Sequence, residues 1–319
     1  MRAIWRWLAG LAVVMAWQSA SADGLCTFSP INIVLPSVST VNGSAITVAA
    51  STTINCSGLP VGNVRVCLQI GAGSNYDAAP ATRYMANGNI GQMQYNIYTD
   101  PSYSTVWGTY ANPPVGYTDV TLSNLLTGSG TLPIYFKIPA NQTGLTQGTY
   151  TASLTANTVA TYVQWLLNVA HPCNTTIENN LGTVPITISA TVIADCSITT
   201  SNIAFGNQGL LNTALTANGA ISVQCTNGSP YTIALDKGTT TGSTLLDRQL
   251  KSGSNIVHYQ LYSDAARTTV WGDGTSGAPT LGKTGSGAIQ NWPVYARIPV
   301  QTTPATGTYT DTITATVSF

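Results

Sequence analysis

The chain carries little charge. Only 7% of its 319 residues are charged, and its 11 Lys and Arg balance 11 Asp and Glu to a formal net charge of +0. Nucleic-acid-binding domains need clustered positive charge, and polybasic segments hold proteins on anionic membranes. We therefore expect no nucleic-acid partner. The composition is 44% hydrophobic with 15 Tyr and 7 Trp, which is enough apolar surface for packed cores.

Histidine is scarce, and the motifs of catalysis are missing. The two histidines, His171 and His258, accompany no GxSxG sequence, and no CxxC or Cys/His cluster suggests zinc. Asp100 and Asp264 match between two repeats described below, and we interpret them as turn-capping residues. A glycosidase carboxylate pair stays open from sequence alone. We nevertheless expect no enzymatic activity, no catalytic or metal site and no cofactor.

Long apolar runs are missing except at the start of the chain. Arg2 and Arg6 precede a short apolar core at 8–17 and the small residues Ala20-Ser21-Ala22. This pattern is typical of a secretory signal peptide, which we assign to residues 1–22. An uncleaved anchor is the alternative. No other stretch is apolar enough to cross a bilayer, so we expect no membrane insertion.

The rest of the chain contains two copies of one unit. MQYNIYTDPSYSTVWG (93–108) matches VHYQLYSDAARTTVWG (257–272), and LPIYFKIPANQTGLTQGTYT (132–151) matches WPVYARIPVQTTPATGTYT (292–310). Short alternating runs are separated by Gly, Asn, Pro and Asp turns, which predicts strands rather than helices. We predict an all-β fold of two immunoglobulin-like β-sandwich domains. Trp107 and Trp271 hold the same repeat position and are expected to be structural.

Six cysteines in an exported chain indicate disulfides. Cys26 and Cys56 are 30 residues apart, and Cys196 and Cys225 are 29 apart, so the repeat suggests two equivalent bridges. The two cysteines that remain, Cys67 and Cys173, would then form a bridge particular to the first copy. Sequence alone permits fifteen connectivities, and the repeat is what selects this one.

These residues resemble a known family. The paired cysteines, Arg248, the run YxLYxDxxxTxVWG and the ending GTYTDTITATVSF resemble the spore coat protein U domain, which supplies the pilins of archaic (Csu-type) chaperone–usher pili. The resemblance implies an immunoglobulin-like sandwich that lacks its last strand. A periplasmic pilus chaperone first fills the gap. After passage through the outer-membrane usher, an adjacent pilin subunit donates its N-terminal strand instead, by β-augmentation.

The two copies differ at this missing strand. Within residues 183–195, four apolar residues alternate with polar ones, and nothing similar precedes Cys26. Twelve extended residues reach about 40 Å, the length of a sandwich. We expect 183–195 to serve as a self-completing strand and linker of an N-terminal adhesin domain, residues 23–195. The apolar residues of this strand are Ile186, Ile188, Ala190 and Val192. A plain linker between two self-sufficient domains is the alternative.

The second domain, residues 196–319, is expected to be an incomplete pilin domain. Ile313, Val317 and Phe319 alternate with polar residues in its last strand and are predicted to belong to the acceptor groove. After signal cleavage only three residues precede Cys26, too few to donate a strand. We therefore expect a subunit that accepts a strand and donates none. Such a subunit would be exported through the periplasm and lie at the cell surface, at the pilus tip.

Two apolar segments are particular to the first domain. The loop after Trp107 carries apolar residues where the matching loop after Trp271 is polar and glycine-rich, and the segment after Ala156 has no counterpart. We predict that they bind an abiotic or host surface and promote biofilm formation, because burial of apolar area gains about 25 cal/mol per Å² and many fibres add avidity. The resemblance points the same way, since the tip subunit of Csu-type pili is thought to bind abiotic surfaces through hydrophobic loops. The predicted contacts are Tyr110, Pro113, Pro114, Val115, Tyr117, Tyr162, Val163, Trp165, Leu166 and Leu167. Three alternatives remain: residues 162–169 belong to the core, the tip is a lectin that stacks Tyr and Trp on a sugar, or the protein is a non-fibrous secreted coat protein.

Overall fold

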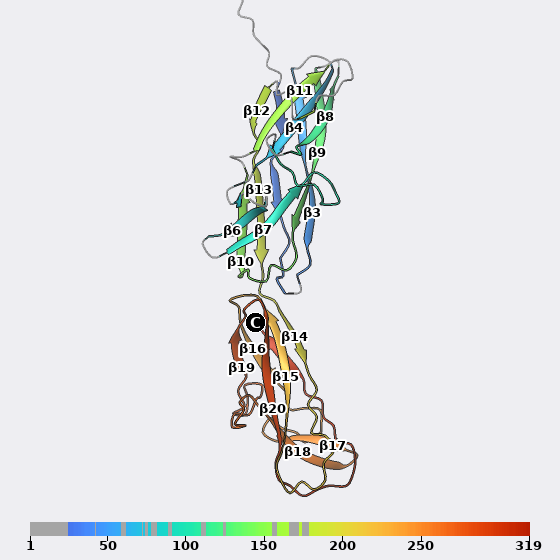
Figure 1. The fold of residues 1–319 in the computed structure, drawn as a ribbon, viewed down its shortest axis with the longest axis vertical. Coiled ribbons are helices and arrows are strands. Elements are labelled where there is room, and N and C mark those ends of the chain that lie inside the picture. The colour runs from blue at the N-terminus through green and yellow to red at the C-terminus, as the bar shows by residue number, and fades with distance from the viewer. Residues whose placement is uncertain are drawn as a thin grey trace, which may run out of the picture.

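The computed structural model is an elongated, all-β molecule (Figure 1). It describes residues 25–41, 43–58, 62–71, 73, 76–77, 82–88, 91–109, 113–123, 126–154, 158–165, 172–173 and 179–319. The predicted signal peptide, Tyr110, Leu166 and Leu167 lie outside the described residues. Within these ranges no helix has the length and apolar character needed to span a membrane.

Two β-sandwiches follow each other along the chain. The first sandwich contains β1 (Leu25–Phe28), β2 (Ile31–Val34), β3 (Ile46–Ser57), β4 (Gly62–Ile70), β5 (Tyr76–Asp77), β6 (Thr82–Asn87), β7 (Gly91–Tyr98), β8 (Gly116–Leu122), β9 (Thr127–Ile138), β10 (Gly148–Ser153), β11 (Thr158–Trp165), β12 (Asn179–Thr183) and β13 (Ile186–Val192). The second sandwich contains β14 (Cys196–Thr200), β15 (Leu215–Cys225), β16 (Pro230–Leu235), β17 (Arg248–Ser252), β18 (Asn255–Tyr262), β19 (Leu281–Thr284), β20 (Ile289–Ile298) and β21 (Ala315–Ser318). The predicted fold class is confirmed.

The two sandwiches share the order of the first five strands in their larger sheets and differ beyond them. One sheet of the first sandwich runs β1-β3-β9-β7-β6-β10-β13-β2, with β5 on β6, and packs on the sheet β12-β11-β4-β8. The second sandwich has β14-β15-β20-β18-β17 packed on β19-β16-β21. Thus β14, β15, β20, β18 and β17 correspond to β1, β3, β9, β7 and β6. The strands β10, β13 and β2 have no strand counterpart in the described second sandwich.

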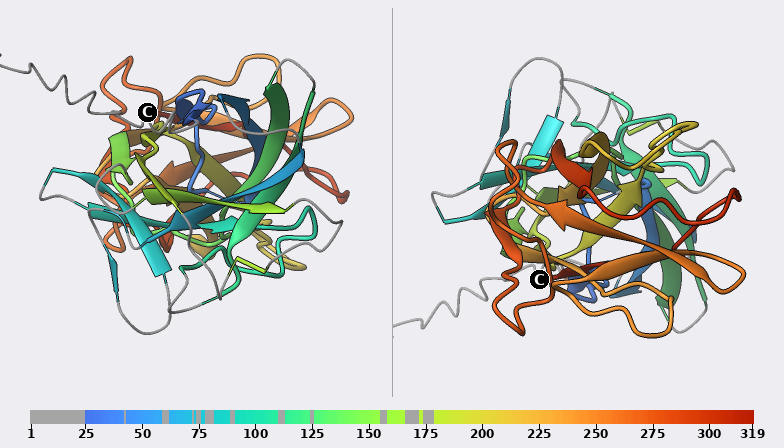
Figure 2. Two further views of the ribbon diagram at one scale, coloured as in Figure 1. Left: turned by 90° about the horizontal axis from the view of Figure 1, so that it is seen from above. Right: turned by 90° about the horizontal axis from the view of Figure 1, so that it is seen from below.

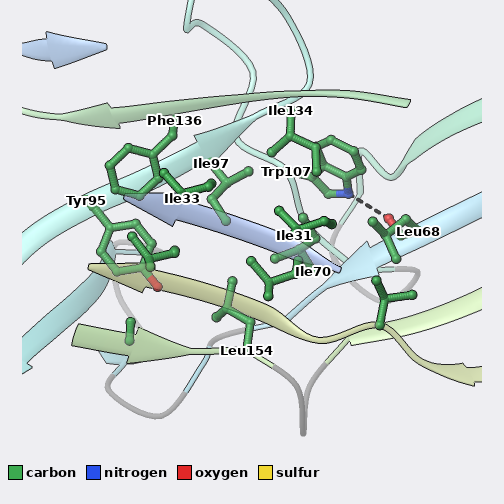
Figure 3. Packing of buried hydrophobic residues seen from close by; sticks show 14 of the residues in the cluster. Ile31, Ile33, Leu68, Ile70, Tyr95, Ile97, Trp107, Ile134, Phe136 and Leu154 are labelled. Atoms are coloured by element: carbon green, nitrogen blue, oxygen red, sulfur yellow. Dashed lines mark hydrogen bonds between the residues drawn. The ribbon is translucent and has the colours of Figure 1, made fainter. Parts of the chain in front are cut away.

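Alternating apolar residues build each core. In β7 and β9, buried residues such as Tyr95, Ile97 and Phe136 alternate with half-buried or exposed ones, as expected for strands with one face covered. The ring of Trp107 lies among them and donates its indole N–H to the carbonyl of Leu68 at 2.6 Å (Figure 3). Trp271 makes the equivalent bond in the second sandwich. The structural role predicted for both tryptophans is confirmed.

Three disulfides fix the sandwiches. Cys26–Cys56 joins β1 to β3, and Cys196–Cys225 joins β14 to β15 at the matching place. Cys67–Cys173 ties β4 to the segment between β11 and β12. Loop closure of this kind stabilises a fold by about 2–4 kcal/mol per bridge.

The two sandwiches are stacked end to end. Figure 1 shows the first above the second, and the views along the long axis in Figure 2 superimpose them. The strand β13 runs down the first sandwich and continues through residues 193–195 into β14. Asp195 and Thr226 clamp this link, because the Thr226 backbone N–H donates to the Asp195 carbonyl at 2.9 Å and its hydroxyl donates to the Ile193 carbonyl at 3.1 Å.

Candidate strand-acceptor groove and distal pole

The first sandwich holds β13 between two other strands. β13 pairs antiparallel with β10, with Ala190 opposite Tyr150, and parallel with β2, with Ile188 opposite Ile33. The four apolar side chains predicted for this strand, Ile186, Ile188, Ala190 and Val192, are at most 2% exposed. The strand therefore fills the core from within the same chain.

The second sandwich has the two flanking segments without a strand between them. Residues 307–312 correspond to β10, and residues 201–204 correspond to β2 by their distance from Cys196. Within the fully described second sandwich, segment 307–312 bonds a neighbouring strand through one bridge, Thr310 to Lys251. The matching pair in the first sandwich is Thr151 and Ala86. The second sandwich therefore has counterparts of the two strands that flank β13, but no strand of the described chain lies between them.

A groove of about 1140 Å³ lies at this place. Segments 200–209 and 303–313 form its edges, and core side chains form its floor. Residues that are fully buried in the first sandwich have half-buried counterparts here: Tyr309 corresponds to Tyr150, and Ile203 to Ile33. The apolar floor consists of Leu215, Ile221, Leu235, Leu250, Val257, Leu261, Val294, Ala296 and Ile298.

The predicted acceptor residues lie at different places relative to this groove. Ile313 is half-buried and lines it. Val317 lies on β21 opposite Ile233 and packs on the second core, next to the groove rather than in it. Phe319 is 57% exposed. β21 pairs with β16 and so occupies the place of the first part of β11, which pairs with β4.

A polar network holds one edge of the groove. The Tyr259 hydroxyl donates to Asp311 at 2.8 Å, and the same carboxylate accepts the backbone N–H of Thr239 at 3.0 Å. Burial, followed by this hydrogen bond and charge of Asp311, raises the pKa of the Tyr259 phenol. Next to it, the buried Arg248 guanidinium donates to the Trp271 carbonyl at 2.8 Å. Asp311 thereby holds segment 307–312 in place, while the backbone edge of this segment that faces the groove has no paired strand among the described residues.

Strand register separates the predicted surface-binding residues into two groups. β11 and β8 lie on either side of β4, and both run antiparallel to it, so they point in the same direction. Gly116, at the start of β8, stands opposite Leu68, whereas Trp165, at the end of β11, stands opposite Asn63 at the other end of β4. Pro113, Pro114 and Val115 therefore lie toward the middle of the molecule. The structure does not bring them to the end that Trp165 occupies.

We call the end of the first sandwich farthest from the second the distal pole. It contains the end of β11, the β8–β9 turn and the end of β3 (Figure 1). Tyr162 stands opposite the buried Val66, and Val163 stands opposite Arg65. Leu126, in the β8–β9 turn, is 42% exposed at φ 58°. Sequence reasoning missed Leu126, although an apolar residue in a turn was the available signal.

Tyr117 belongs to a small cluster on the outer face of β4 and β8. Its ring is 50% exposed and lies 4.0 Å from the Arg65 guanidinium carbon. Arg65 is held in a two-point ion pair with Asp119, with both N–O distances at 2.7 Å. The hydrogen bond that Arg65 donates to the Asp119 carboxylate raises the pKa of Arg65. Such a planar stack offers a rigid aromatic surface, which composition alone did not indicate.

Comparisons with known proteins agree with the repeat and the fold. A profile of the Spore Coat Protein U domain matches residues 13–157 and again 182–316. Protein U of Myxococcus xanthus is 34% identical over 116 residues, which cover 34% of this chain and 63% of that protein, so the match spans less than two thirds of it.

Among solved structures, a chain from the CsuC–CsuE chaperone–tip adhesion subunit pre-assembly complex of archaic chaperone-usher Csu pili of Acinetobacter baumannii has a similar fold. The TM-score is 0.56 at 18% identity, over 92% of this chain and all of that one. The CupB6 tip adhesin from Pseudomonas aeruginosa aligns at a TM-score of 0.41 and 13% identity, over 92% and 94% of the two chains.

Proposed function

Because the chain belongs to the Spore Coat Protein U domain family, we propose that it is the tip subunit of a chaperone–usher pilus. Its second sandwich accepts a β-strand from a partner, and its first sandwich faces outward. The observation that carries this proposal is the groove between segments 201–204 and 307–312, at the position that β13 fills in the first sandwich.

A strand is expected to bind in this groove because the groove leaves apolar core residues and backbone hydrogen-bonding groups uncovered. Apolar floor residues such as Leu250 and Val257 line the groove, and the backbone of 307–312 has few bonded partners. A strand added there gains main-chain hydrogen bonds on two edges and buries every second side chain. In the orientation of β13, it would pair antiparallel with 307–312 and parallel with 201–204. A periplasmic chaperone strand and then an adjacent pilin strand are the proposed occupants.

The asymmetry between the sandwiches supports the tip position. The first sandwich is closed by its own β13 and needs no donor, whereas the second needs one. A subunit with one acceptor site, next to a self-closed domain, fits the end of a fibre. The fold shared with a tip-subunit complex agrees with this arrangement. Export through the periplasm, passage through the usher and display at the cell surface follow from the same proposal.

Adhesion is proposed for the distal pole of the first sandwich. The exposed Leu126 lies there, together with the end of β11, where the sequence predicts an apolar segment through Leu167. Contact with an apolar surface needs no particular receptor chemistry, so this pole would support attachment and biofilm formation.

The groove is tested with a synthetic strand. We expect the labelled peptide VPITISATVIAD (184–195) to bind the full chain and raise the melting temperature of the second sandwich, because ligand binding favours the folded state. A peptide with Ile188→Asp should not bind. The protein variant Ile203→Asp should lose peptide binding, while Ile289→Asp, at an exposed position, should keep it. Equal binding by both protein variants, or none by the wild type, would rule out a strand-acceptor groove.

A further inference from the structure

We propose that the lower pole of the second sandwich is a docking face for the end of the next family domain in the fibre. The lower pole consists of the loop leading into β15 (206–214) and the loop leaving β20 (299–306). This inference rests on the proposed function and names a second contact between subunits, beyond the donated strand.

The junction inside this chain provides the template. The loops that lead into β3 and leave β9 meet the turns 226–229 and 285–287 of the second sandwich. The Asn227 amide donates to the Gly144 carbonyl at 2.9 Å, and Asn227 forms a parallel bridge with Thr146. Thr40 and Thr226 bond through their hydroxyls at 3.4 Å. The lower end of the first sandwich thus contacts the turns at the upper end of the second.

The fit at this junction is close. A Cβ added to Gly287 would lie 1.9 Å from the Thr143 carbonyl oxygen, so only glycine permits the approach. Val41, in the loop leading into β3, is 6% exposed, yet it belongs to neither hydrophobic core cluster. Its burial is what contact with the second sandwich predicts.

The same loops recur at the lower pole of the second sandwich. β15 and β20 begin their pairing with Leu215 opposite Ile298, as β3 and β9 do with Ile46 opposite Ile138. The paired loops are also bonded alike, since Gln301 donates its backbone N–H to the Leu211 carbonyl at 3.1 Å and Asn141 donates to Gly43 at 3.3 Å.

Here, however, the apolar side chains are uncovered. Leu210 is 69% exposed and Val300 is 63% exposed, one on each of the two loops. Figure 2, in the view from below, looks onto this end. Two exposed apolar residues on adjoining loops, at the place where the homologous sandwich is covered, indicate a surface that a partner buries.

The path of a donated strand identifies the partner. β13 leaves the first sandwich at its lower end, and the next sandwich begins at Cys196, after the three linking residues 193–195. A strand lying in the groove in the orientation of β13 would end at the lower pole of the second sandwich. The body attached to it would then sit against Leu210 and Val300. The fitting partner is a family domain that presents small-residue turns like TNGS (226–229) and GSG (285–287).

Photocrosslinking in assembled fibres tests this contact. p-Benzoylphenylalanine is placed at Leu210, at Val300, or at the control Ile289, which is 64% exposed but lies at the other end of β20. Irradiation of fibres carrying the full chain should join it to a second subunit from positions 210 and 300, and not from 289. The double variant Leu210→Asp, Val300→Asp should lower incorporation severalfold while leaving binding of peptide 184–195 unchanged.

The two proposals fail in distinguishable ways. A detergent-resistant complex with the next subunit, seen before heating, reports the donated strand. If that complex forms but positions 210 and 300 give no more crosslink than 289, the docking face is wrong and the groove stands. If wild-type protein forms no such complex, both proposals fall.

Discussion

Each sandwich buries an arginine against backbone carbonyl groups. Arg83 donates to the carbonyls of Ile70 at 2.7 Å and Trp107 at 2.8 Å, and Arg248 donates to that of Trp271 at 2.8 Å. Burial lowers the pKa of Arg248, and these bonds compensate part of the cost of burying its charge. The repeated tryptophan segment is thereby tied to the neighbouring strand in both halves. Arg248 was visible in the sequence as part of a family pattern. Apart from the Gln260 amide oxygen, however, its hydrogen-bond partners are backbone carbonyls, which no side-chain motif reveals.

The predicted turn-capping aspartates behave as expected. Asp100 accepts the backbone N–H of Thr105 at 2.7 Å, and Asp264 accepts that of Thr269 at 2.6 Å. The bond from Thr269 is the main cause that lowers the pKa of Asp264. Residues whose partners lie within five positions were predictable from sequence, because local turn chemistry fixes them.

Leu126 is the residue at which the adhesive proposal can be tested with least disturbance. Asparagine tolerates positive φ, so Leu126→Asn removes the apolar side chain without straining the turn. We expect this variant, and Trp165→Ser, to lower attachment of piliated cells to polystyrene severalfold. Pro113→Ser, at the middle of the molecule, is the control and should attach normally. Attachment is counted on washed surfaces at equal fibre density.

The same attachment assay also distinguishes an apolar contact from the lectin alternative. Wild-type attachment that detergent lowers and free sugars leave unchanged agrees with an apolar contact. Attachment that a free sugar blocks, with Leu126→Asn unaffected, would replace the apolar pole with a sugar site.

Among the elements, β13 shows what the alternation of apolar and polar residues can predict and what it cannot. Alternation in residues 186–192 predicted a half-buried strand, and its burial pattern alternates accordingly. The pattern gave neither its neighbours nor its register, because these depend on strands more than thirty residues away in the chain. For the same reason, the sequence assigned the groove to three residues of the last strand, of which Ile313 lines it, and did not indicate the edge segment 201–204. It also grouped Pro113 with Trp165, which register separates.

Truncating one side chain of β13 tests its part in the first sandwich. Ile188 is 2% exposed, so Ile188→Ala should lower the free energy of unfolding by about 2–5 kcal/mol through lost burial and a residual cavity. Thr191→Ala, on the exposed face of the same strand, should change it by less than about 0.5 kcal/mol. Calorimetry of the full chain should show the effect in one transition, with the second sandwich unchanged. Equal, small effects at both positions would mean that β13 is a dispensable linker.

For the molecule as a whole, the stiffness of the junction between the two sandwiches determines how firmly the first sandwich is oriented relative to the fibre. Asp195 lies in the link, and its backbone N–H donates to the Thr226 hydroxyl at 3.1 Å. Ser39 of the first sandwich donates to the Asp195 carboxylate at 2.5 Å. Contacts from both sandwiches and from the link therefore converge on residues 195 and 226. Such a junction would transmit the direction of the fibre to the distal pole, whereas a flexible linker would let the pole swing.

Removing one hydroxyl tests this stiffness. Thr226→Val keeps the shape of the fully buried side chain but leaves the Asp195 N–H and the Ile193 carbonyl without that partner. We expect a broader distribution of distances between dyes attached to the two sandwiches, measured by single-molecule energy transfer. The control Thr216→Val, on the exposed face of β15, should keep the narrow distribution. If both variants match the wild type, the hydroxyl bonds at residue 226 do not set the angle between the two sandwiches.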